Sequence, residues 1–143
     1  MLTEALRLPF AEQGAKLGVV GSLPYLPLTL TYKNSSLAVS GLLDTGATVN
    51  VLPYDIGNRL NAVWEQQRTM VRLTGNLARF EARAILVTAT IGSFAPVPLA
   101  FAWTRSNDVP LILGHVNFFL EFEVCSFRAR KFFEIRPMTK SDL

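Results

Sequence analysis

The chain has 143 residues, of which 50% are hydrophobic and 17% charged, and its formal net charge is +3. This length fits one domain with a core of its own. The apolar composition indicates an additional buried surface, such as a subunit interface. The small basic excess argues against a nucleic-acid-binding protein, because the one basic run, residues 128–131, is typical of a solvated turn.

The sequence also bears on compartment and membrane contact. Cys125 is the only cysteine, so an intrachain disulfide is excluded; this suits a reducing compartment, and we expect a cytoplasmic protein. The N-terminus carries Glu4 and Arg7 without an early apolar run, so we expect no cleaved signal peptide. Residues 84–104 are uncharged and long enough to span a bilayer, but Gly92 and two prolines favour strands joined by a turn. We therefore expect no stable membrane insertion.

The chain divides by pattern into an arm or tail (residues 1–23), one domain (24–137) and a C-terminal tail (138–143). Glycines interrupt the arm, and Leu6 belongs at most to a short amphipathic turn. Whether the arm is a removable pro-segment stays open. In chain order the domain is expected to contain strands over 24–32, 37–43 and 48–52, a helix over 54–60, strands over 67–73, 77–88 and 94–103, a helix over 115–120, and strands over 122–127 and 132–135. Short strands with two brief helices predict a mostly antiparallel β barrel or sandwich.

One acid follows an apolar strand directly: Asp44 comes after Leu43 and before Thr45-Gly46-Ala47. A carboxylate at the end of a buried strand is costly unless it is paired or used, so we predict that Asp44 is catalytic. The alternative is an Asx-type turn in which Asp44 caps its own backbone. The chain has no second Asp-Thr-Gly and no histidine or cysteine cluster, so we expect no metal and no cofactor.

Three motifs occur in order: Gly41-Leu42-Leu43-Asp44-Thr45-Gly46-Ala47, Val51-Leu52-Pro53 and Leu111-Ile112-Leu113-Gly114. Together they resemble the retropepsin-like aspartic proteases, a clan of retroviral and retrotransposon proteases with bacterial relatives. The resemblance covers roughly residues 25–136 and suggests a bacterial-type, single-domain member. It implies a closed antiparallel β barrel and an aspartic endopeptidase that acts on peptides or proteins as a homodimer, because each subunit supplies one loop.

The resemblance also implies the chemistry and the roles of the neighbours. Two Asp44 carboxyls would share one proton and activate a water. Thr45 would hydrogen-bond across the dimer axis, and the small Gly46 and Ala47 would leave room for the partner loop and the peptide. The residues that would pack beneath this loop are Ile112, Leu113 and Gly114. The residues that would form a flap over the peptide are Leu73, Thr74, Gly75, Asn76 and Leu77. An ordinary surface hairpin is the alternative for this last segment.

Two positions depart from the retroviral pattern. Thr48 and His115 stand where retroviral members carry an acid and an arginine that pair with each other. We interpret His115 first as a helix-start residue and second as a pH-sensitive interface residue. The added C-terminal hairpin is expected either to form the dimer sheet or to cap the barrel. Two other functions stay open: a binding or dimerisation module with little or no proteolytic activity, and a non-enzymatic β domain.

Overall fold

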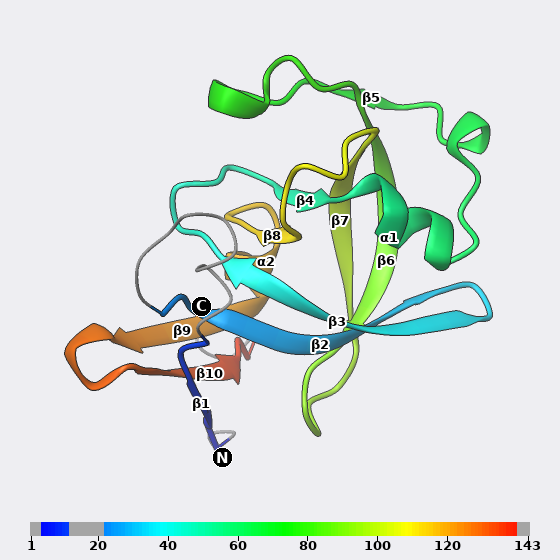
Figure 1. Cartoon of the computed structure of the whole chain (residues 1–143). Coiled ribbons are helices and arrows are strands. Elements are labelled where there is room, and N and C mark those ends of the chain that lie inside the picture. The colour runs from blue at the N-terminus through cyan, green and yellow to red at the C-terminus, as the bar shows by residue number, and fades with distance from the viewer. Residues whose placement is uncertain (1–3, 12–21, 140–143) are drawn as a thin grey trace.

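The computed structural model describes residues 4–11 and 22–139. These residues form a β barrel with a small three-stranded sheet packed against one end (Figure 1). The strands are β1 (Leu6–Pro9), β2 (Tyr25–Tyr32), β3 (Ser35–Leu43), β4 (Asn50–Leu52), β5 (Met70–Val71), β6 (Ala82–Thr90), β7 (Val97–Thr104), β8 (Ile112–Leu113), β9 (Phe122–Phe127) and β10 (Phe132–Pro137). The two helices are α1 (Tyr54–Arg59) and α2 (Phe118–Glu121), and 3₁₀ turns cover Trp64–Gln66, Gly75–Leu77 and Arg128–Arg130.

The barrel is closed. Six strands follow one another in the order β2-β3-β8-β4-β7-β6, and β6 pairs back with β2, for example Leu30 with Ala89. Most neighbours are antiparallel, but β3–β8 and β4–β7 are parallel. The short β5 extends the sheet from the outer side of β6. The predicted fold class, a mostly β single-domain closed barrel with two short helices, is therefore confirmed.

The β2–β3 hairpin shows how the sequence sets this barrel. Leu26, Leu28 and Leu30 alternate along β2, and all three are buried in the core. The turn is shorter than residues 33–36, because Lys33 and Asn34 alone connect the strands and Lys33 takes a positive φ of 52°. A two-residue turn pairs the flanking residues directly, so Ser35 already belongs to β3.

Aromatic side chains fill the other end of the barrel. The rings of Trp64 and Trp103 meet edge to face at 5.2 Å, and Tyr54 stacks on Trp103 at 5.7 Å. Gly57 in α1 lies so close to the Trp103 indole that an added Cβ would collide with it. This glycine therefore weakens α1 by propensity yet allows the helix to seat on the core.

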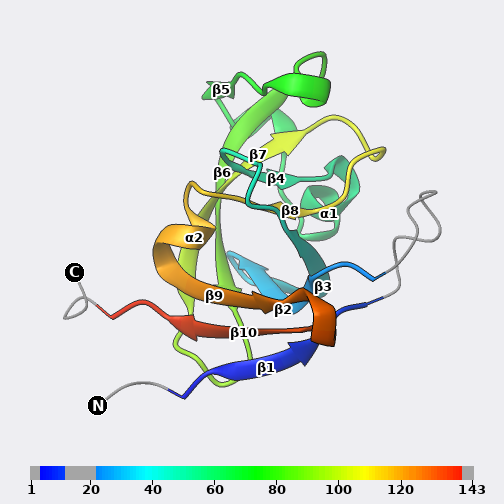
Figure 2. The ribbon, with the colours of Figure 1, turned by 90° about the vertical axis from the view of Figure 1, so that its left-hand side faces the viewer.

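The three-stranded sheet has the order β1-β10-β9 and is antiparallel throughout (Figure 2). Its inner face contributes Phe122, Phe133 and Ile135 to the core, so the C-terminal hairpin covers the barrel. The strand β1 replaces the amphipathic turn predicted around Leu6, because its alternating side chains pack beside β10. Residues 12–21 of the predicted arm and residues 140–143 of the predicted tail lie outside the described residues.

Three predicted elements differ most in extent. Only Met70 and Val71 form a strand within residues 67–73, and the following strand begins at Ala82 instead of residue 77. The intervening residues form a loop with a 3₁₀ turn, since they lack a partner strand among the described residues. The second helix begins at Phe118, three residues later than predicted. Within residues 4–11 and 22–139, no helix reaches the length and hydropathy that a bilayer crossing requires.

Candidate active site

Asp44 is held where the sheet places it, at the end of β3. The strand runs parallel to β8, and the Leu42 and Asp44 amides donate to the carbonyls of Leu111 (2.8 Å) and Leu113 (3.0 Å). Ile112 and Leu113 are buried beside this strand end. The structure thus brings together the acid and the later apolar motif, which are about 70 residues apart in the chain.

A tight turn follows the acid. The Ala47 amide donates to the Asp44 carbonyl at 3.1 Å, and the Gly46 amide donates to Asp44 Oδ1 at 2.9 Å. This second bond is the one expected of an Asx-type turn. It engages one carboxylate oxygen and leaves Oδ2 without a hydrogen-bond partner among the described residues. Asp44 is half-buried, while Thr45 and Gly46 are exposed, so the turn points out of the subunit.

Gly114 fits beneath this turn because it has no side chain. An added Cβ would lie 2.5 Å from the Val49 carbonyl oxygen and 2.8 Å from that of Ala47. Two bonds hold the neighbouring backbone: His115 N donates to Ala47 O at 3.0 Å, and Val116 N donates to Thr48 O at 2.9 Å. The two segments therefore run side by side at a separation that only glycine allows.

Two bonded asparagines, the buried Asn50 and the half-buried Asn117, support the same region, and sequence reasoning missed them. Asn50 has no exposed surface; its Oδ1 accepts from the Gly114 amide at 2.8 Å and its Nδ2 donates to Ala100 O at 3.0 Å. Asn117 Oδ1 accepts from the Ala100 amide at 2.9 Å and from Asn50 Nδ2 at 3.3 Å. The available signal was an amide side chain inside an apolar strand, because such a group must be hydrogen-bonded.

His115 contacts the Asp44 loop (residues 44–47) directly. Its Nε2 lies 2.6 Å from the Thr45 carbonyl oxygen. A carbonyl can only accept, so Nε2 must carry the proton. The ring also packs against Phe119 at 5.6 Å between centroids. His115 precedes α2 by three residues, so the predicted helix-start position is wrong and the histidine instead joins the loop to the helix.

A cleft of about 310 Å³ lies between the Asp44 loop and the segment Leu73–Leu77. Leu73 is buried and Leu77 half-buried, while the three residues between them are exposed. Gly75 takes a positive φ of 62°, which opens the 3₁₀ turn at the tip. The described residues that line the cleft are Asp44, Gly46, Ala47, Thr48, Val49, Val51, Leu73, Thr74, Gly75, Asn76, Leu77 and Ile112. Of these, Asp44 has the one ionisable side chain, so the cleft suits an uncharged, partly apolar ligand.

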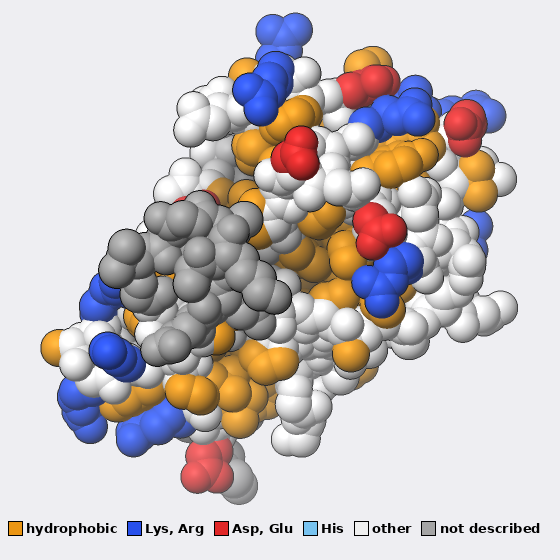
Figure 3. All heavy atoms as spheres, in the orientation of Figure 1, with side chains coloured by type: hydrophobic (Ala, Val, Ile, Leu, Met, Phe, Trp, Pro, Cys, Tyr) orange, Lys and Arg blue, Asp and Glu red, His pale blue; other side chains and the backbone are white. Residues whose placement is uncertain are grey.

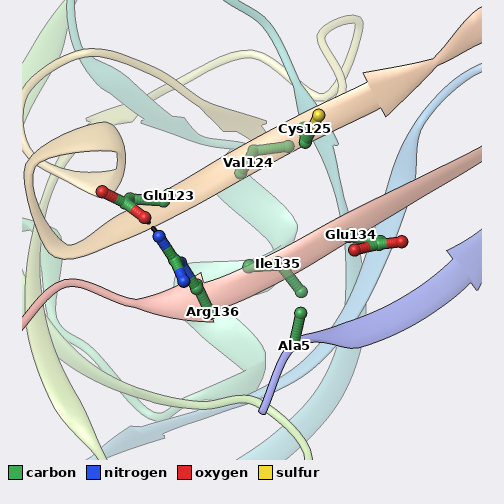
Figure 4. Close-up of a pocket in the computed structure, with 7 residues that line it drawn as sticks. All are labelled: Ala5, Glu123, Val124, Cys125, Glu134, Ile135 and Arg136. Carbon is green, nitrogen blue, oxygen red and sulfur yellow. Dashed lines mark hydrogen bonds and ion pairs between the residues drawn. The ribbon is translucent and has the colours of Figure 1, made fainter. Parts of the chain in front are cut away.

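A second hollow, of about 390 Å³, lies on the outer face of the β9–β10 sheet (Figure 4). Its charged side chains are already paired: Arg136 with Glu123 at 2.6 Å, and Glu134 with Arg7 at 2.7 Å. The exposed Cys125 has no neighbouring histidine in this lining. Paired surface charges give no reactive group, so the larger hollow is a weaker candidate than the Asp44 cleft.

No group of three or more histidine, cysteine, aspartate or glutamate side chains within residues 4–11 and 22–139 could hold a metal ion.

Comparison with known proteins identifies the fold. No protein-family model and no curated protein matches the sequence significantly. Among solved structures, a retropepsin-like aspartic protease from Rickettsia conorii superimposes with a TM-score of 0.62 at 12% identity, over 92% of this chain and 98% of that one. The retroviral protease-like domain of Ddi1 from Leishmania major gives 0.59 at 15% identity, over 86% of this chain and 99% of that one. At such identities the similarity concerns architecture alone, and the predicted resemblance is confirmed at that level: this chain has the retropepsin-like fold.

Proposed function

We propose that the protein is an aspartic endopeptidase that works as a homodimer. The observation that carries the proposal is the placement of Asp44: it stands at the end of β3, beside exposed Thr45 and Gly46, and opens into a cleft. In the described residues no second carboxylate lines that cleft, so a second copy of the chain must supply it. A cytoplasmic location belongs to the same proposal and rests on the single cysteine.

In the dimer, the two Asp44 side chains would face each other across a two-fold axis. Two carboxyls in close contact cannot both be ionised, so the pair retains one proton. The ionised member takes a proton from a water, which attacks the scissile carbonyl carbon. The protonated member hydrogen-bonds the carbonyl oxygen and stabilises its developing charge.

The rest of the site would position this pair. The Gly46 amide orients Asp44 through Oδ1 and leaves Oδ2 to face the partner and the water. Thr45 would bond across the axis, and the small Gly46 and Ala47 would admit the partner loop. The segment from Leu73 to Leu77 would close over an extended peptide, and its two leucines would contact apolar side chains of the substrate.

The alternative is a retropepsin-fold binding or dimerisation module with little turnover. It is favoured by the short 3₁₀ turn at Gly75–Leu77, which offers less extended backbone to a peptide than a long hairpin would. It is also compatible with an Asp44 that only caps the Gly46 amide.

The test compares wild type with Asp44→Asn, which keeps the shape and the local bond but cannot ionise. Both proteins are incubated with a mixed peptide library between about pH 4 and 7, the range in which carboxylate pairs of this kind operate. The cleavage products are identified by mass spectrometry. We expect cleavage by wild type and a loss of at least about 10³-fold in Asp44→Asn. Equal cleavage by both proteins would sink the protease proposal. Sedimentation under the same conditions tests the dimer, and a monomer that still cleaves would contradict the shared site.

A further inference from the structure

One edge of β3 is left open. The hairpin turn between β2 and β3 has two residues, so Tyr32 and Ser35 form the first hydrogen-bonded pair. Hydrogen-bonded and non-bonded pairs alternate along antiparallel strands. The backbone N–H and C=O groups of Ser36, Ala38 and Ser40 therefore point away from β2, and all three residues are exposed.

The same edge is used farther along the strand. The amides of Leu42 and Asp44 point to this side and donate to Leu111 and Leu113. But β8 pairs with β3 only at Leu42 and Leu43. Before Leu42, no strand in the described part of the chain covers this side, so a row of donors and acceptors continues without a partner.

An apolar groove of about 600 Å³ lies along this open edge, between β3 and α1. In Figure 3, hydrophobic side chains line a hollow near the middle of the face, over the space between β3 and α1 in Figure 1. Its lining consists of Pro27, Ala38, Val39, Ser40, Pro53, Ile56, Arg59 and Leu111. A bond of 2.7 Å from Asn61 Nδ2 to Ser35 Oγ ties α1 to β3 beyond the groove. The open edge over residues 36–40 is about 16 Å long at the usual strand rise.

The groove carries one charge. Arg59 is the ionisable side chain in the lining that the structure describes. Its partner is Asp55 on the same helix, at an N–O distance of 4.0 Å, and both side chains are more than half exposed. Such a pair is weak, so a carboxylate delivered into the groove can compete for the guanidinium.

We propose that this groove binds an extended segment of a partner protein by strand addition to β3. The segment would carry aliphatic side chains at alternate positions, facing Val39, Ile56 and Leu111, and a carboxylate that meets Arg59. The groove shares no lining residue with the Asp44 cleft, so this recognition does not depend on catalysis.

Two features select this occupant. A row of main-chain groups is satisfied by another backbone, and a compact apolar ligand would leave it unpaired. A second copy pairing through its own β3 would bring the sequence Ser35 to Leu43, which contains no acid, and would leave Arg59 without a new partner. A peptide with an acidic side chain satisfies both the backbone and the charge.

The experiment uses synthetic peptides and the full chain carrying Asp44→Ala, so that no peptide is cleaved. The probe is acetyl-Thr-Val-Thr-Val-Thr-Asp-Thr-amide, in which both valines and the aspartate occupy alternate positions and therefore face the same side of the added strand. One control peptide replaces Asp by Lys, and another replaces every Val by Ser. Binding is followed by the backbone amide shifts of a ¹⁵N-labelled protein. We expect shifts at Ala38, Ser40 and Ile56, and at least about tenfold weaker binding of both control peptides.

Variants assign the contacts. Ala38→Pro removes one outward N–H without breaking the β2–β3 ladder, in the way that Pro27 already occupies a non-bonded position of β2. It should weaken the probe at least tenfold. Arg59 lies on the exposed surface of α1, so we expect the Arg59→Glu protein to fold normally. This variant should prefer the Lys peptide over the Asp peptide. Lys33→Glu changes an exposed cation of the same hairpin outside the groove and should leave affinity unchanged.

Three results would overturn the proposal. One is unchanged affinity in both Ala38→Pro and Arg59→Glu. Another is a set of shifts confined to Gly46 and Gly75, which would place the peptide in the Asp44 cleft. The third is peptide-free self-association that Ala38→Pro abolishes, since the edge would then serve a second copy. The outcome is independent of whether wild type cleaves peptides, so failure here leaves the protease proposal standing.

Discussion

The two walls of the Asp44 cleft are built in opposite ways. On one side, the Asp44 loop is held against residues 111–117 by backbone hydrogen bonds, by the close approach at Gly114 and by the buried Asn50. On the other side, the residues Thr74 to Asn76 are exposed and lie in a loop between the short β5 and β6. The wall formed by Thr74 to Asn76 is therefore the less restrained of the two. In the proposed protease, this less restrained wall would open to admit an extended peptide beside the fixed acid.

Substitution of Asn50 is expected to have the largest effect on stability of the changes that distinguish the two walls. Asn50→Ala would leave the Gly114 amide, the Ala100 carbonyl and Asn117 short of partners in a buried site. We expect a loss of about 3–4 kcal/mol in the free energy of unfolding, measured by urea titration. The matched control is Asn76→Ala on the opposite wall, where the side chain is exposed and the cost should stay within about 0.5 kcal/mol. Equal costs at the two asparagines would erase the difference between the walls.

Two glycines give a second, smaller contrast. Gly114→Ala places a methyl 2.5 Å from the Val49 carbonyl oxygen, so backbone must move, at a cost of about 2–3 kcal/mol. Gly75→Ala meets no atom within 4 Å and suffers only from its positive φ, which costs about 1 kcal/mol. Thermal unfolding of both variants should rank them in that order. A larger effect at Gly75 would mean that the cover is more tightly fixed than its exposure indicates.

The fold was predictable where the pattern is periodic. Leucine alternation locates β2, and the apolar run ending in Asp44 locates β3 and its acid. The pairing of β3 with β8 joins residues about 70 positions apart, and only the resemblance to a known family suggested it. The roles assigned to Thr45 and to the segment 73–77 stay predictions, since they concern a dimer and a bound peptide.

The missed features share a physical cause. The loop between β5 and Ala82 has strand-like composition, but its backbone does not extend because it has no neighbouring strand among the described residues. β1 is a strand because β10 pairs with it, which local pattern cannot reveal. In the sequence, Asn50 is one polar residue among apolar ones. Its role as a hydrogen-bonding link is visible only in the fold, where its side chain bonds to β7 and to Gly114. In each case a tertiary partner decides the local structure.

His115 allows the finest test of this comparison, because its exposed side chain links the Thr45 carbonyl of the Asp44 loop to Phe119 of α2 and can be changed without touching the core. His115→Phe keeps the contact with Phe119 but removes the donor to the Thr45 carbonyl, which is exposed and can turn to water. The cost to unfolding should therefore be only about 0.5–1 kcal/mol. His115→Gln restores a side-chain N–H and should recover part of it. The amide signal of Gly46 in a ¹⁵N spectrum should shift in His115→Phe and return toward wild type in His115→Gln, while Gly75 stays constant. A shift at Gly75 as large as that at Gly46 would mean that the two walls are coupled and do not move separately.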